Sequence, residues 1–136
     1  MRAVERADSD LSVVRHDQIA SLEKAVSLWG RGRVYSAMVS GVELEPEYGL
    51  SFEEAARIEL QGAEDLCSRG IIPIYSITWP VGGRERPDYH QQLRTFFGRL
   101  NDGYAAIRRK HGLQIWEGFM CHRCAYMQLE CDVDRA

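Results

Sequence analysis

The sequence predicts an α/β fold with a parallel sheet, made of about three βα units in one chain of 136 residues. Segments with helical periodicity alternate with short apolar segments along most of the chain. The loop lengths also alternate. Each predicted helix reaches the next strand through a very short turn, whereas the strand-to-helix loops at 42–50 and 80–87 are longer and irregular. Parallel βα units place all strand-to-helix loops at one edge of the sheet, so functional residues are expected at that edge.

The first helix is predicted over Asp17 to Trp29, with Gly30 ending it. Its apolar residues recur on one face: Ile19, Leu22, Val26 and Trp29. We expect these residues to pack inward, Trp29 included. The following segment, RVYSAMVSGV at 33–42, is rich in apolar and β-branched residues but does not alternate cleanly. This pattern predicts a strand that is buried on both faces.

The second helix is predicted to begin at a capping box formed by Ser51 and Glu54 and to end at Gly70. Its inward-facing residues are Phe52, Ala56, Leu60, Ala63 and Leu66. Cys67 lies on the same apolar side and is expected in the core. The segment IIPIYSITW at 71–79 predicts the second strand.

The third helix is predicted over Asp88 to Lys110, although two internal glycines, Gly98 and Gly103, disfavour an unbroken helix. Its inward-facing residues are Leu93, Phe96, Phe97, Leu100, Tyr104 and Ile107. The segment LQIWEGF at 113–119 predicts a third strand. The chain therefore divides into an irregular N-terminal segment at 1–16, a partial βα barrel of about three units at 17–117 and a cysteine-containing segment at 118–136.

Composition narrows the class of protein. Hydrophobic residues make up 45% and charged residues 27% of the chain, as in ordinary globular domains. The net charge of -3 offers no basic surface for nucleic acid. The opening MRAVERADSD is charged where a signal peptide would be apolar, and no segment is long enough to cross a membrane. We therefore expect a cytoplasmic protein with reduced thiols, in which clustered cysteines favour a metal site over disulfides.

Two stretches of the sequence, taken together and in this order, resemble a known protein family. SLEKAVSLWGRGRVYSAMVSGVELEP followed by GAEDLCSRGIIPIYSITWPVGG resembles the second half of a radical S-adenosylmethionine enzyme, in the branch that includes biotin synthase. The matching elements are a glycine and acid after a strand (Gly41-Val-Glu43), then Gly70-Ile-Ile-Pro73, and then Pro80-Val-Gly-Gly83. The resemblance extends roughly from Ile19 to Gly83.

This resemblance implies a partial (β/α) barrel, because a complete one needs about 250 residues. The C-x-x-x-C-x-x-C motif that binds the radical-generating cluster in that family is absent from the sequence. A partner chain would have to supply the cluster-bearing N-terminal half. In a complete enzyme of this kind, reductive cleavage of S-adenosylmethionine yields a radical that takes hydrogen from a small-molecule substrate. This chain is not expected to be active alone.

The resemblance also suggests S-adenosylmethionine contacts. Gly41 and Glu43 match the glycine and acid at the end of a strand that contacts the ligand, and Glu45 is a second candidate for the acid. Trp79 and Pro80 match the strand end that helps to cover adenine. The alternative is that both glutamates are solvated loop residues and that the tryptophan is a packing residue.

Cys121, Cys124 and Cys131 form the remaining motif, within GFMCHRCAYMQLECD. On a continuous helix they share one face, but Cys124 and Cys131 would lie roughly 10 Å apart along the axis, too far to share an ion. A shared site requires a turn after Ala125, whereas AYMQLE favours helix. Two interpretations remain open: thiolates on a helix face without a ligand, or a metal site with His122 as a further candidate ligand.

Three thiolates suit an iron–sulfur cluster with one open iron position. The resemblance implies an auxiliary [4Fe-4S] cluster, and zinc is the alternative. If zinc binds, the chain is better interpreted as a non-catalytic α/β module for metal binding or protein interaction.

Overall fold

The computed structural model describes residues 17–45, 48–77 and 86–115. Residues 17–29 are helical. They are followed by β1 (Val34–Ser40), a short 3-10 helix η1 (Val42–Leu44), α2 (Phe52–Ser68), β2 (Ile71–Ile77) and α3 (Tyr89–Lys110). The described part of the chain is therefore a mixed α/β fold, as the sequence predicts.

β1 and β2 form a parallel sheet, in register from Val34 opposite Ile71 to Ser40 opposite Ile77. α2 connects the two strands, which is the βαβ arrangement that a parallel pair requires. Both strands therefore end at the same edge, which we call the carboxyl edge. The amino edge is closed by a hydrogen bond from the Gly32 amide to the Gly70 carbonyl, 2.8 Å.

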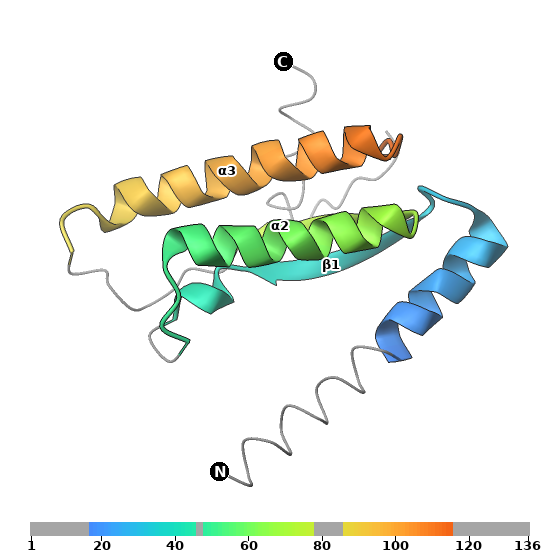
Figure 1. Cartoon of the computed structure of the whole chain (residues 1–136), viewed down its shortest axis with the longest axis horizontal. Helices are drawn as coiled ribbons and strands as arrows, with labels where there is room; N and C mark the ends of the chain where they lie inside the picture. Colours follow the sequence, from blue (N-terminus) through green and yellow to red (C-terminus); the bar gives the residue numbers. More distant parts are fainter. Residues whose placement is uncertain (1–16, 46–47, 78–85, 116–136) are drawn as a thin grey trace, which may run out of the picture.

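α2 and α3 cover one face of this sheet (Figure 1). Their shared core includes Ala56 and Ala63 of α2, Phe96, Leu100 and Tyr104 of α3, and Tyr75 of β2. The helix at residues 17–29 packs beside α2 through Leu22, Ala25 and Val26, which contact Val34, Leu66 and Ile71. None of the described helices combines the length and apolar character that crossing a membrane requires.

The helix ends agree with the sequence prediction. The Ser51 side chain accepts from the Glu54 amide, and the Glu54 side chain accepts from the Ser51 amide, so the capping box is formed. α3 continues through both of its internal glycines. A Cβ atom at Gly103 would clash with the Leu60 side chain of α2, so this glycine allows α2 and α3 to approach closely.

Three expectations need correction. Residues 113–115 of the predicted third strand are not in a strand, and the remainder lies outside the described residues. The Leu113 amide bonds the Arg108 carbonyl at 3.0 Å, and the Leu113 carbonyl accepts from the Arg108 guanidinium at 3.3 Å. Because both backbone groups of Leu113 serve the end of α3, they are not available to a strand ladder.

The other two corrections concern burial. β1 is not buried on both faces: on the face opposite α2, Tyr35 packs against the cluster that contains Ile72, but Ala37 is exposed and Val39 is 56% exposed. Trp29 is 67% exposed rather than packed inward, because the helix at 17–29 contacts the fold through residues that precede it. The division of the chain into three segments stays a prediction.

Candidate functional site

The carboxyl edge holds a tight turn directly after β1. Gly41 is buried and adopts φ 97°, in the left-handed region where glycine avoids the Cβ clash. η1 follows at once, with the Leu44 amide bonding the Gly41 carbonyl at 3.2 Å and the Glu45 amide bonding the Val42 carbonyl at 3.0 Å. The chain therefore reverses direction within five residues of the strand end.

This turn brings together the first three candidate residues. The Gly41 amide donates to Glu43 Oε2 at 3.2 Å, so the carboxylate folds back over the end of β1. Glu43 and Glu45 are both half-buried, which differs from the alternative of fully solvated loop acids. Trp79 and Pro80 lie outside the described residues, and their role stays a prediction.

Behind the turn lies a buried acid that was not among the predicted site residues. Glu59 of α2 is 3% exposed. Its Oε1 atom accepts a hydrogen bond from Ser40 Oγ at the end of β1, and a second one from the Tyr104 hydroxyl at 2.9 Å. Its Oε2 atom is buried and has no hydrogen-bond partner among the described residues. Glu59 thus links β1, α2 and α3 at the base of the turn.

Burial raises the pKa of the Glu59 carboxyl above its ordinary value, because the charged form loses its hydration. The hydrogen bonds from Ser40 and Tyr104 oppose that rise, and the negative charge of Glu43 adds to it. The sequence does contain a signal for this residue. Glu59 falls on the helix face that carries Ala56 and Ala63, so it is an acid within an apolar stripe.

The Tyr104 hydroxyl also lies 3.4 Å from Met38 Sδ of β1. The Tyr104 ring is tilted against Tyr75, with ring centroids 5.0 Å apart. Tyr75 in turn donates to Asn101 Oδ1 at 3.3 Å. The hydrogen-bonding groups of Tyr75, Asn101 and Tyr104 therefore lie between the sheet and the two helices, next to Glu59.

A cavity of about 370 Å³ lies between the first turns of α2 and α3. The rings of Phe52 and Phe96 form its apolar part, with centroids 5.9 Å apart. Polar side chains surround them: Ser51, Glu53, Gln91, Gln92, Thr95 and Arg99. This cavity opens on the helix layer and not on the Gly41 turn.

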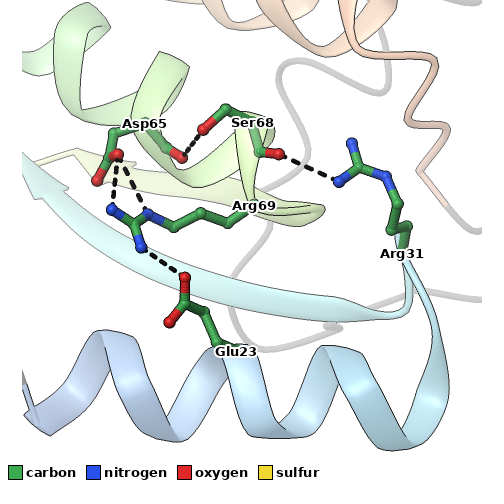
Figure 2. A network of polar contacts seen from close by, with 5 residues as sticks. All are labelled: Glu23, Arg31, Asp65, Ser68 and Arg69. Atoms are coloured by element: carbon green, nitrogen blue, oxygen red, sulfur yellow. Dashed lines mark hydrogen bonds and ion pairs between the residues drawn. The ribbon is translucent and has the colours of Figure 1, made fainter.

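The amino edge carries a different kind of polar cluster (Figure 2). Arg31 donates to the Ser68 carbonyl at 3.1 Å, which satisfies one of the last carbonyls of α2. Arg69 bridges Asp65 at 3.1 Å and Glu23 at 2.5 Å, and so ties the helix at 17–29 to α2. All of these groups satisfy one another, which indicates a structural role.

The predicted metal ligands Cys121, Cys124 and Cys131 lie outside the described residues, so their geometry stays untested. Among the residues that the structure does describe, no group of three or more His, Cys, Asp or Glu side chains could hold a metal ion. Cys67 is fully buried in α2, as predicted for a core residue.

Comparison with known proteins adds nothing to this geometry. No protein family model, no curated protein and no solved structure matches the chain.

Proposed function

We propose that this chain is the C-terminal part of a radical S-adenosylmethionine enzyme, a segment of a (β/α) barrel that contributes ligand contacts from the carboxyl edge. A partner chain would supply the barrel half that carries the C-x-x-x-C-x-x-C cluster motif. The proposal rests on the sequence resemblance from Ile19 to Gly83, together with three features of the fold.

The observation that carries the proposal is the placement of the helices. α2 and α3 lie on one face of the sheet (Figure 1), and the helix at 17–29 packs against Val34 and Ile71 of that face and against Leu66 of α2. Doubly wound α/β folds place helices on both faces of the sheet, whereas a (β/α) barrel places every helix on the outer face. Consecutive helices on one face fit a barrel segment, and they also occur within one half of a doubly wound fold.

The uncovered face of β1 gives a second argument. In a barrel, the face opposite the helices points into the barrel interior, where side chains from the other strands cover it. Ala37 and Val39 of β1 lie on that opposite face and are exposed. Strands from a partner half would cover them.

The turn after β1 is the third argument. Gly41 lets the backbone approach a ligand closely, and the Glu43 carboxylate offers oxygen acceptors for the ammonium or the ribose hydroxyls of S-adenosylmethionine. Glu45 lies at the end of the same turn and is the second candidate for this contact. Once bound beside a reduced cluster, S-adenosylmethionine supplies radical chemistry. The role of these residues is to hold and orient it.

The proposal also assigns a role to the cysteine-containing segment at 118–136. Cys121, Cys124 and Cys131 would hold an auxiliary [4Fe-4S] cluster with one open iron position. If the same thiolates bind zinc instead, the second candidate gains support: a non-catalytic α/β module for metal binding or protein interaction.

The test combines metal analysis with calorimetry on the full chain, purified anaerobically. We expect iron and sulfide with visible absorption, and weak binding of S-adenosylmethionine that strengthens when a C-x-x-x-C-x-x-C partner is added. Glu43→Gln should weaken that binding about tenfold, the loss typical of one charged hydrogen bond. Glu53→Gln is the matched control, because Glu53 is an exposed glutamate in the first turn of α2.

Three results would argue against the proposal. The first is no binding of S-adenosylmethionine even with the partner present. The second is equal loss of affinity in the Glu43→Gln and Glu53→Gln variants, which would show a general charge effect. The third is zinc without visible absorption, which would favour the interaction module.

A further inference from the structure

We propose that the neutral form of the buried Glu59 carboxyl allows the end of β1, with the turn at 41–45, to pack against α2 and α3, and that this packing weakens as pH rises. Glu59 would then be a positioning residue for the candidate site. Its link to S-adenosylmethionine rests on the proposed function, whereas its effect on the turn does not.

The geometry of the carboxyl group is the first step. Glu59 Oε1 receives both available donors, Ser40 Oγ and the Tyr104 hydroxyl. Oε2 lies in the core and has no partner among the described residues. A full negative charge on this group would leave half of the carboxylate without a donor, which is far more costly in the core than an unpaired neutral oxygen.

The charges around the carboxyl group are the second step. η1 contributes Glu43, whose negative charge opposes ionisation of Glu59. α3 contributes Tyr104, and β2 contributes Tyr75 behind it. β1 contributes only neutral groups, Ser40 and Met38. The described groups that act on Glu59 therefore include no cation to compensate a carboxylate charge.

The connection to the turn is the third step. Ser40 bonds Glu59 and is followed directly by Gly41, whose amide bonds Glu43. When Glu59 loses its proton, its negative charge and that of Glu43 repel each other across this short segment. The repulsion is relieved by moving the turn at 41–45 away from α2, because Glu59 itself is fixed within a helix.

The direction of the pH dependence follows from linkage. Burial raises the pKa of Glu59 in the folded chain above its ordinary value of 4.5. Between the unfolded and the folded pKa, the folded state binds more protons, so stability falls as pH rises through that window. The unfolding equilibrium constant then increases by up to about tenfold per pH unit.

The experiment compares the wild-type full chain with Glu59→Gln by urea unfolding from pH 4.5 to pH 8.5. The amide keeps an oxygen for Ser40 and Tyr104 but cannot ionise. Near pH 4.5 we expect the wild type and the variant to unfold at the same urea concentration. As pH rises, the wild type should unfold at progressively lower urea concentration than the variant. Glu53→Gln, on the exposed surface of the same helix, should give a constant difference across this range.

Hydrogen exchange reports on the turn itself, whether or not S-adenosylmethionine binds. The amides of Gly41, Leu44 and Glu45 are hydrogen-bonded in the turn. Their protection factors should fall as pH rises in the wild type and stay constant in Glu59→Gln. If ligand binding is absent but this difference is present, the proposed function fails and the positioning role of Glu59 stands.

Parallel pH profiles of wild type and Glu59→Gln, in both unfolding and exchange, would overturn the inference. If Glu59→Gln does not fold, Tyr104→Phe replaces it. The Tyr104 hydrogen bond lowers the pKa of Glu59, so removing it should widen the pH window over which stability is lost. A Tyr104→Phe profile with the same pH dependence as wild type would also overturn the inference.

Discussion

Single residues at the helix ends make local contributions that can be measured one at a time. Ser51 and Glu54 satisfy each other's backbone amides at the start of α2, with distances of 3.0 Å and 3.2 Å. The Ser51 side chain, followed by its amide, lowers the pKa of Glu54. The contribution of Glu54 is therefore present above its unfolded pKa and is lost as pH falls, which is the opposite direction from Glu59.

We predict that Ser51→Ala destabilises the chain by about 1 kcal/mol, the usual cost of losing an N-cap side chain. Chemical denaturation at neutral pH measures this change. Ser27→Ala is the control, because Ser27 is exposed inside a helix and bonds only a local carbonyl, that of Lys24. A cost for Ser51→Ala no larger than that of the control would show that the capping box does not stabilise α2.

The helix at 17–29 is attached to the rest of the described fold by a small set of contacts. It contacts the core through Leu22, Ala25 and Val26, and through the ion pair between Glu23 and Arg69, whose side chains are 48% and 33% exposed (Figure 2). Ion pairs that are this exposed contribute little. α2, by contrast, packs against both the sheet and α3. This helix should therefore open locally before the rest of the fold.

We predict that Val26→Ala lowers the amide protection of residues 21–29 but leaves that of α2 and β2 nearly unchanged. Removing two buried carbon atoms costs about 1 kcal/mol at a half-buried position. Leu28→Ala is the matched control in the same helix, because Leu28 is 69% exposed. Equal loss of protection in all helices would mean that the described fold opens as one unit.

In the described part of the molecule, the sheet face opposite the helices is uncovered at the end of β1, although Ile72 and Ile74 of β2 are buried on that face. Val39 of β1 is 56% exposed on the face opposite the helices. A strand surface of this kind promotes association with other chains. The isolated chain should therefore self-associate, and the partner half of the proposed barrel should suppress that association.

We predict that Val39→Lys shifts the isolated chain toward the monomer in sedimentation measured over a range of concentrations. Ile58→Lys is the control, because Ile58 is 42% exposed on α2, on the opposite face of the sheet. It should leave the association unchanged. A wild-type monomer with a sharp cooperative melt would count against the partial barrel.

The sequence by itself determined the three described helices, the two described strands and their order, because the signals involved are local. Ser51 and Glu54 are three residues apart, Gly70 follows the last turn of α2, and apolar residues recur at helical spacing in α3. Alternating loop lengths also predicted a parallel sheet, and with it the position of Gly41, Glu43 and Glu45 at the carboxyl edge. These features depend on neighbours within about one turn of chain.

Only the tertiary structure decided which faces are covered and which side chains meet. Val39 and Trp29 are apolar, so their sequence pattern predicted burial, but no described element packs over them. Glu59 is 19 residues from Ser40 and 45 residues from Tyr104 in the sequence. Its pKa is raised because the packing of α2 between β1 and α3 removes water from the carboxyl group, and no local pattern specifies that packing.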